Sequence, residues 1–177
     1  GAATKTQEGL AVFSEFITGC IDVRRMRRIM NRVEAIQMAI DGADFIQVYR
    51  FFLERSRLKT EAFENARRIF RGGVMSGGAP FTKDIVYLEG LVRINNFIRA
   101  VVSRGRNYVL ELLFAGKMEL DDMPIILEMK KEGMVKPPRY LPDWVLDKDY
   151  LVSYFALSIF IGEMDHHKTD GYYQSLF

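Results

Sequence analysis

Apolar residues recur every three or four positions through most of the chain, which is the spacing of an amphipathic helix. The clearest case lies between Asp22 and Ile40, where the apolar side chains are Met26, Ile29, Met30, Val33, Ile36 and Ile40. The pattern is helical almost throughout. We therefore predict an all-α fold, a multi-helix globular domain.

Capping residues and glycines divide this pattern into separate helices. Thr4 with Gln7 and Asp44 with Gln47 have the spacing of a capping box, so each pair is expected to start a helix. A last helix is expected after Trp144 and fades near Gly162. The other predicted helices cover residues 7–18, 22–40, 45–54, 60–70, 82–104, 108–115 and 118–131.

One loop interrupts the helices, because residues 71–80 contain four glycines and cannot form a helix. Glycine pairs let the backbone approach a ligand closely, and this loop leads into a helix N-terminus, which is the geometry of an anion site. Arg71 and Lys83 flank the loop. The alternative is a plain connector between two helices.

We expect one domain over residues 1–162, followed by a polar and aromatic tail over 163–177 that could be a loop, a swapped arm or disordered. The longest apolar stretch, 150–161, is shorter than the roughly 20 residues that a membrane span needs. It is expected to form a buried core helix, so no membrane partner is predicted.

Composition narrows the possible functions. Charged residues make up 27% of the chain, but the net charge is only +2, which does not favour nucleic-acid binding. The single cysteine, Cys20, excludes an internal disulfide framework and suits a reducing compartment. With no signal peptide at the start, we expect a cytoplasmic protein, and we expect Cys20 to be a small core residue.

A basic run lies near the start of the second predicted helix. It consists of Arg24, Arg25, Arg27 and Arg28, with Arg32 one turn further on. Such a run could bind phosphates or an acidic protein tail. The alternative is a solvated helix face, which is the commoner use of a charged run.

The most informative string is Gln7-Glu8-Gly9-Leu10-Ala11. It places the carboxylate of Glu8 in the first turn of the first predicted helix. A carboxylate there is favoured by the helix dipole alone. The functional alternative is a metal-ligating glutamate, as in peptidases whose two histidines come from another helix.

This string and a second one, residues 78–90, resemble the QEGLA-motif family. That family includes bacterial proteins described as flavohemoglobin-expression modulators, and the eukaryotic microtubule-associated tyrosine carboxypeptidases. The resemblance extends from about Thr6 to Tyr140. It implies a zinc peptidase that removes the C-terminal residue of a peptide or protein substrate.

By this resemblance Glu8 is the third zinc ligand, and a His-Glu-x-x-x-His helix precedes it in sequence. The chain has only two histidines, His166 and His167, which are adjacent and would point about 100° apart on a helix. We therefore expect the C-terminal part of a longer zinc enzyme, which by itself binds no zinc, is inactive and could dimerise through its uncovered apolar face.

Our hypothesis for the substrate site uses the loop. Arg71 and Lys83 would hold the free carboxylate of the substrate. Tyr87, one turn after Lys83, would assist by stabilising an oxyanion. The rival hypothesis is a non-catalytic helical interaction or regulatory module.

Overall fold

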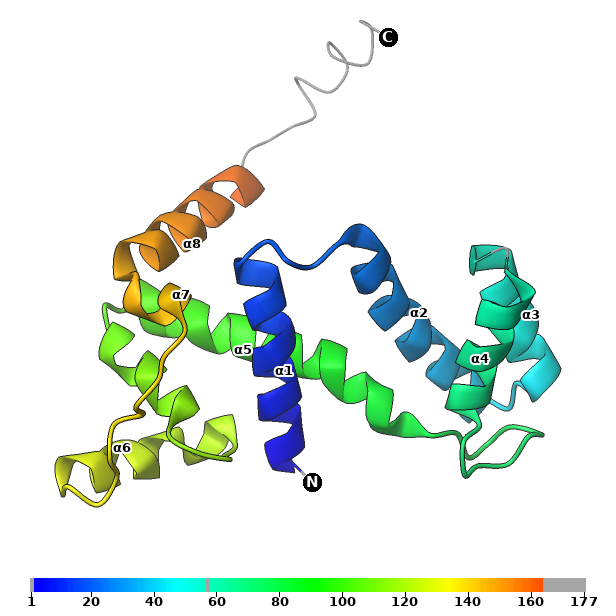
Figure 1. The fold of residues 1–177 in the computed structure, drawn as a ribbon, viewed down its shortest axis with the longest axis horizontal. Helices are drawn as coiled ribbons and strands as arrows, with labels where there is room; N and C mark the ends of the chain where they lie inside the picture. Colours follow the sequence, from blue (N-terminus) through cyan, green and yellow to red (C-terminus); the bar gives the residue numbers. More distant parts are fainter. Residues whose placement is uncertain (1, 57, 164–177) are drawn as a thin grey trace, which may run out of the picture. The chain divides into compact units, whose positions relative to one another are not determined.

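The computed structural model of the chain describes residues 2–56 and 58–163 (Figure 1). Every regular element in this part of the chain is a helix, which confirms the all-α prediction. The α-helices are α1 (Ala2–Ile17), α2 (Val23–Ile40), α3 (Phe45–Ser56), α4 (Lys59–Ile69), α5 (Ile85–Ser103), α6 (Met123–Lys131), α7 (Asp143–Leu146) and α8 (Lys148–Glu163). Three short 3-10 helices join them: η1 (Thr82–Asp84), η2 (Asn107–Phe114) and η3 (Leu120–Asp122).

Two helix starts are set by side chains that cap the free N–H groups of the first turn. At α2 the backbone N–H of Arg25 donates to the carboxylate of Asp22, at 2.5 Å. At α3 the backbone N–H of Gln47 donates to Asp44 at 2.8 Å, and the backbone N–H of Asp44 donates to the side chain of Gln47 at 2.9 Å. The predicted capping box at Asp44 is confirmed.

Other boundaries differ from the prediction. Helix α1 is already helical at Ala2, so Thr4 lies inside it and does not start it. The segment 107–114 forms a 3-10 helix, because its buried residues pair at a spacing of three, Val109 with Leu112 and Leu110 with Leu113, which matches three residues per turn. The expected last helix is divided into α7 and α8 at Asp147, whose ψ of 85° is not helical.

The chain divides into two compact units. Unit 1 contains residues 1–97 and 117–125, and unit 2 contains residues 98–116 and 126–177.

One part of unit 1 is a three-helix cluster in which α2, α3 and α4 pack on one another. The core of this cluster is apolar and almost completely shielded from water, which is the main stabilising contribution at this size. It consists of Ala35, Ile36, Ala39, Val48, Phe51, Phe52, Ala62, Ala66, Ile69 and Phe70. Only part of the apolar stripe predicted for α2 is buried, since Met30 and Ile40 remain exposed.

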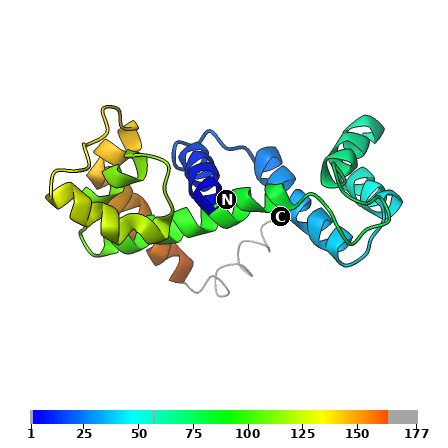
Figure 2. The ribbon, with the colours of Figure 1, turned by 90° about the horizontal axis from the view of Figure 1, so that it is seen from below.

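In the rest of unit 1, helices α1 and α5 cross at two glycines, Gly9 and Gly90 (Figures 1 and 2). A Cβ atom at Gly9 would lie 2.2 Å from the carbonyl carbon of Gly90, and one at Gly90 would lie 2.4 Å from the carbonyl oxygen of Lys5. Only glycine lets two helix backbones approach this closely. Beside the crossing, Lys5 Nζ and Glu89 Oε1 form an ion pair of 2.8 Å.

In unit 2 the ring of Trp144 packs edge-on against Phe114, with ring centroids 5.9 Å apart. Helix α8 differs from the expected buried core helix, because only Leu151 and Phe155 are buried in it. Its apolar residues lie all round the helix, so a single packing face cannot cover them, and Leu157 and Phe160 are exposed. In the described residues no helix is both long enough and apolar enough to cross a membrane.

Two further expectations concern single segments. Cys20 is exposed in the loop after α1, so the prediction of a core cysteine is wrong. Its backbone N–H donates to the carbonyl of Glu15, which closes the end of α1 and turns the residue away from the core. The predicted tail 163–177 lies outside the described residues except for Glu163, the last residue of α8.

The glycine crossing predicts a strong effect of one methyl group. We expect Gly90→Ala to lower the free energy of unfolding by about 3 kcal/mol, because the added Cβ meets rigid backbone and the two helices must separate. Urea unfolding followed by circular dichroism measures this. Gly162→Ala is the control, because among the described residues no atom outside the adjoining backbone of α8 lies within 4 Å of its Cβ position. An equal loss in both variants would contradict the role of the crossing.

Candidate functional site

Glu8 lies on α1 directly before the glycine that contacts α5. Its side chain is half-buried, and among the described residues it has no hydrogen-bond or ion-pair partner. The same tripeptide, Glu-Gly-Leu, stands on both sides of the crossing, as Glu8-Gly9-Leu10 and Glu89-Gly90-Leu91. Glu89 is neutralised by Lys5, whereas Glu8 is left available.

A metal ion needs several donors around it. In the described part of the chain, no three His, Cys, Asp or Glu side chains are grouped closely enough to hold one. His166 and His167 lie outside the described residues. Glu8 is therefore a single candidate donor, and the described residues do not by themselves fit a zinc site.

The glycine-rich loop is fastened to the three-helix cluster by its own backbone. The N–H of Gly78 donates to the carbonyl of Ala39 at 2.7 Å, at the end of α2. The carbonyl of Met75 accepts from the N–H of Phe45 at 2.9 Å, at the start of α3. The N–H of Gly73 donates to the carbonyl of Phe70 at the end of α4, and the N–H of Gly77 donates to the carbonyl of Val74, so these loop amides already have acceptors.

The predicted substrate-binding residues stand at the two ends of this loop. Arg71 is exposed, and its guanidinium carbon lies 4.5 Å from the centre of the Phe81 ring, a cation–π contact. Lys83 is exposed on η1. Tyr87 is half-buried on the first turn of α5. No hydrogen bond, ion pair or ring contact joins Arg71, Lys83 and Tyr87 among the described residues.

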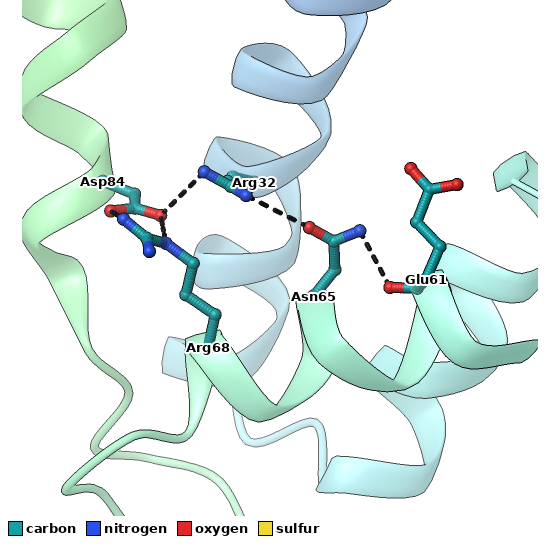
Figure 3. Close-up of polar contacts among 5 residues, drawn as sticks. All are labelled: Arg32, Glu61, Asn65, Arg68 and Asp84. Carbon is teal, nitrogen blue, oxygen red and sulfur yellow. Dashed lines mark hydrogen bonds and ion pairs between the residues drawn. The ribbon is translucent and has the colours of Figure 1, made fainter.

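The structure instead brings together a polar cluster that sequence reasoning missed. Its centre is Asp84, whose carboxylate is almost completely buried and accepts two hydrogen bonds from Arg68, at 2.5 and 2.9 Å (Figure 3). Arg32 Nη1 lies 3.5 Å from the same carboxylate, and Arg32 Nη2 donates to Asn65 at 3.3 Å. We call Asp84, Arg68, Arg32 and Asn65 the Asp84 cluster. It joins α2, α4 and η1, which directly precedes α5.

Some signal for this cluster is present in the sequence. Asp84 lies in the second string of the family resemblance, and Arg32 follows the basic run. Neither fact indicates that the two residues meet, because they come from helices that are far apart along the chain.

The cluster has an excess of positive charge, since two guanidinium groups share one carboxylate. The hydrogen bond from Arg68 to Asp84 raises the pKa of Arg68, and the nearby phenol of Tyr87 adds to this. Burial lowers the pKa of Arg32, and the neighbouring charge of Arg68 lowers it further, against the attraction of Asp84. The Nε atom of Arg32 is buried without a hydrogen-bond acceptor in the described part of the chain.

Two pockets of similar size open beside the cluster and share Asn65. The first, which we call the arginine pocket, has a volume of about 500 Å³ and contains four arginines: Arg32, Arg67, Arg68 and Arg71. The second, the neighbouring pocket, has a volume of about 520 Å³ and contains Arg24, Arg27, Arg28 and Arg55. The basic run of the sequence therefore lines a hollow as well as a solvated face.

The Asp84 cluster predicts a large cost for losing its carboxylate. We expect Asp84→Asn to lower the free energy of unfolding by about 3 kcal/mol, because Arg32 and Arg68 then lose their shared counter-charge. Chemical unfolding measures it. Glu64→Gln is the control, since it breaks the Arg67 ion pair, in which both side chains are more than half exposed, and should cost less than about 1 kcal/mol. Similar costs for the two variants would contradict the buried role of Asp84.

Comparison with known proteins gives one clear relationship. No curated protein and no solved structure gives a significant match to the chain. The family model described as microtubule-associated tyrosine carboxypeptidase matches residues 1–163. This range includes Glu8, the glycine crossing, the glycine-rich loop and the Asp84 cluster. The chain therefore belongs to the microtubule-associated tyrosine carboxypeptidase family.

Proposed function

We propose that the chain forms the C-terminal part of a carboxypeptidase-like zinc metallopeptidase, and that Glu8 is one of its metal ligands. The observation that carries the proposal is the state of this carboxylate: it is half-buried and unpaired among the described residues. Glu89, the equivalent residue in the second copy of the tripeptide, is neutralised by an ion pair with Lys5. The family relationship, which covers the motif around Glu8, supports the same assignment.

In this proposal the remaining ligands and the general base come from outside the described residues, because no three possible metal ligands are grouped together within them. The contribution of this chain is to hold one carboxylate in place. The crossing of α1 and α5 at backbone contact distance fixes the position of Gly9. Glu8 directly precedes Gly9 on α1, so the crossing also fixes the backbone that carries its side chain. The chain by itself is then expected to bind no zinc and to be inactive.

The substrate in this proposal is the C-terminus of a peptide or protein. Arg71 and Lys83 would bind its terminal carboxylate, and both side chains are exposed and have no carboxylate partner among the described residues. Tyr87 would assist by donating a hydrogen bond to a developing oxyanion. The family description names tyrosine as the residue removed, so a C-terminal tyrosine is the first substrate to test.

A second candidate function is a non-catalytic helical interaction or regulatory module, with homodimerisation as one form of it. The exposed apolar side chains of α8, Leu157 and Phe160 among them, favour this candidate. Metal content distinguishes the two, because a pure interaction module needs no zinc.

The first experiment compares zinc content in the protein at its natural full length. We expect about one zinc per chain in the wild type and its loss in Glu8→Gln, because the amide is a poor zinc ligand. Glu89→Gln is the matched control, since it alters the same tripeptide on the other side of the crossing and should keep the metal. Zinc retained in Glu8→Gln, or absent from the wild type, would reject the assignment.

The second experiment tests the carboxylate anchor. We expect Arg71→Gln to raise KM for a peptide with a free C-terminal carboxylate by about tenfold, which corresponds to the loss of one charge-assisted hydrogen bond. Release of the terminal residue is followed with free and amidated peptides. An unchanged KM for the free acid would remove Arg71 from the substrate site.

A further inference from the structure

The arginine pocket carries more positive charge than its own carboxylates neutralise. Arg67 is paired with Glu64, and Arg32 and Arg68 share the single charge of Asp84. The guanidinium of Arg71 lies over the ring of Phe81 and has no carboxylate partner among the described residues. Four guanidinium groups thus face two carboxylates, which leaves an excess of two positive charges around a volume of about 500 Å³.

Arg32 shows that this excess is not relieved inside the protein. Burial lowers the pKa of its guanidinium, the attraction of Asp84 opposes this, and the like charges of Arg68, Arg28 and Arg25 lower it further. Its buried Nε lacks an acceptor in the described part of the chain. A buried donor without an acceptor and a charge without a full counter-charge are both unfavourable, and an anion bound in the pocket would reduce the charge imbalance.

The surrounding charge strengthens the attraction. The two pockets together are lined by eight arginines and three carboxylates, those of Asp22, Glu61 and Glu64. Two further carboxylates, Asp84 and Glu34, pair with arginines of this lining, so arginines still outnumber carboxylates. The whole chain has a net charge of only +2, so its positive charge is concentrated around these hollows. A concave site of one charge sign concentrates ligands of the other sign.

We propose that the arginine pocket binds a ligand through a phosphate group. A phosphate dianion matches the excess of two positive charges, and its oxygens can accept hydrogen bonds from several planar guanidinium groups at once. A single carboxylate carries half this charge and has two oxygens. The proposal shares only Arg71 with the proposed substrate site and uses neither Glu8, Lys83 nor Tyr87, so it can hold whether or not the peptidase function does.

The test uses isothermal titration calorimetry with inorganic pyrophosphate. We expect saturable binding in the wild type, about fivefold weaker binding in Arg67→Gln and tighter binding in Glu64→Gln, which frees Arg67 from its partner. These positions leave the Asp84 cluster intact and avoid Arg71, so a failure here is separate from a failure of the carboxylate anchor. Arg50→Gln on the exposed face of α3 is the control and should bind like the wild type.

Further arms identify the ligand and the pocket. Adenosine monophosphate, compared with inorganic phosphate, distinguishes a nucleotide from a free phosphate, and binding of either one supports the proposal. The absence of binding at millimolar concentration would overturn it. So would a loss in Arg27→Gln as large as in Arg67→Gln, which would place the ligand in the neighbouring pocket, or tighter binding of a tri-glutamate peptide than of pyrophosphate.

Discussion

The buried carboxylate of Asp84 is the constraint on which the arrangement of α2, α4 and η1 depends. It lies at the point where the chain leaves the glycine-rich loop, and it accepts hydrogen bonds from Arg68 while attracting Arg32. Burying such a charge is costly unless partners surround it, so the three elements are held only in the arrangement that brings both guanidinium groups to it. The apolar core of the three-helix cluster supplies most of the stability, and Asp84 determines how the three elements are oriented.

The crossing of α1 and α5 is set by a different kind of force. No side chain separates Gly9 from Gly90, so van der Waals contact between backbones determines the distance. Two identical tripeptides meet there with different results, because Lys5 neutralises Glu89 and nothing in the described part of the chain neutralises Glu8. The motif that identifies the family therefore combines a packing residue with a carboxylate that packing leaves free.

Local features were predictable from the sequence, and contacts between distant segments were not. The capping box of Asp44 and Gln47 depends on residues three positions apart, and the structure has it as predicted. The 3-10 form of 107–114 and the exposure of α8 depend on what packs against them, and the spacing of apolar residues in the sequence does not indicate these contacts. Glu8, Arg71, Lys83 and Tyr87 were proposed from motifs and stay predictions, whereas Asp84 acquires its role only when Arg68 and Arg32 meet it.

The position of Cys20 has a practical consequence. It is the only thiol in the chain and is exposed in the short connection between α1 and α2. A spin label or fluorophore attached there would be site-specific without removal of any other cysteine from this chain. It would stand between the helix that carries Glu8 and the helix that carries the basic run. One spectroscopic probe would then lie next in sequence to both of these helices.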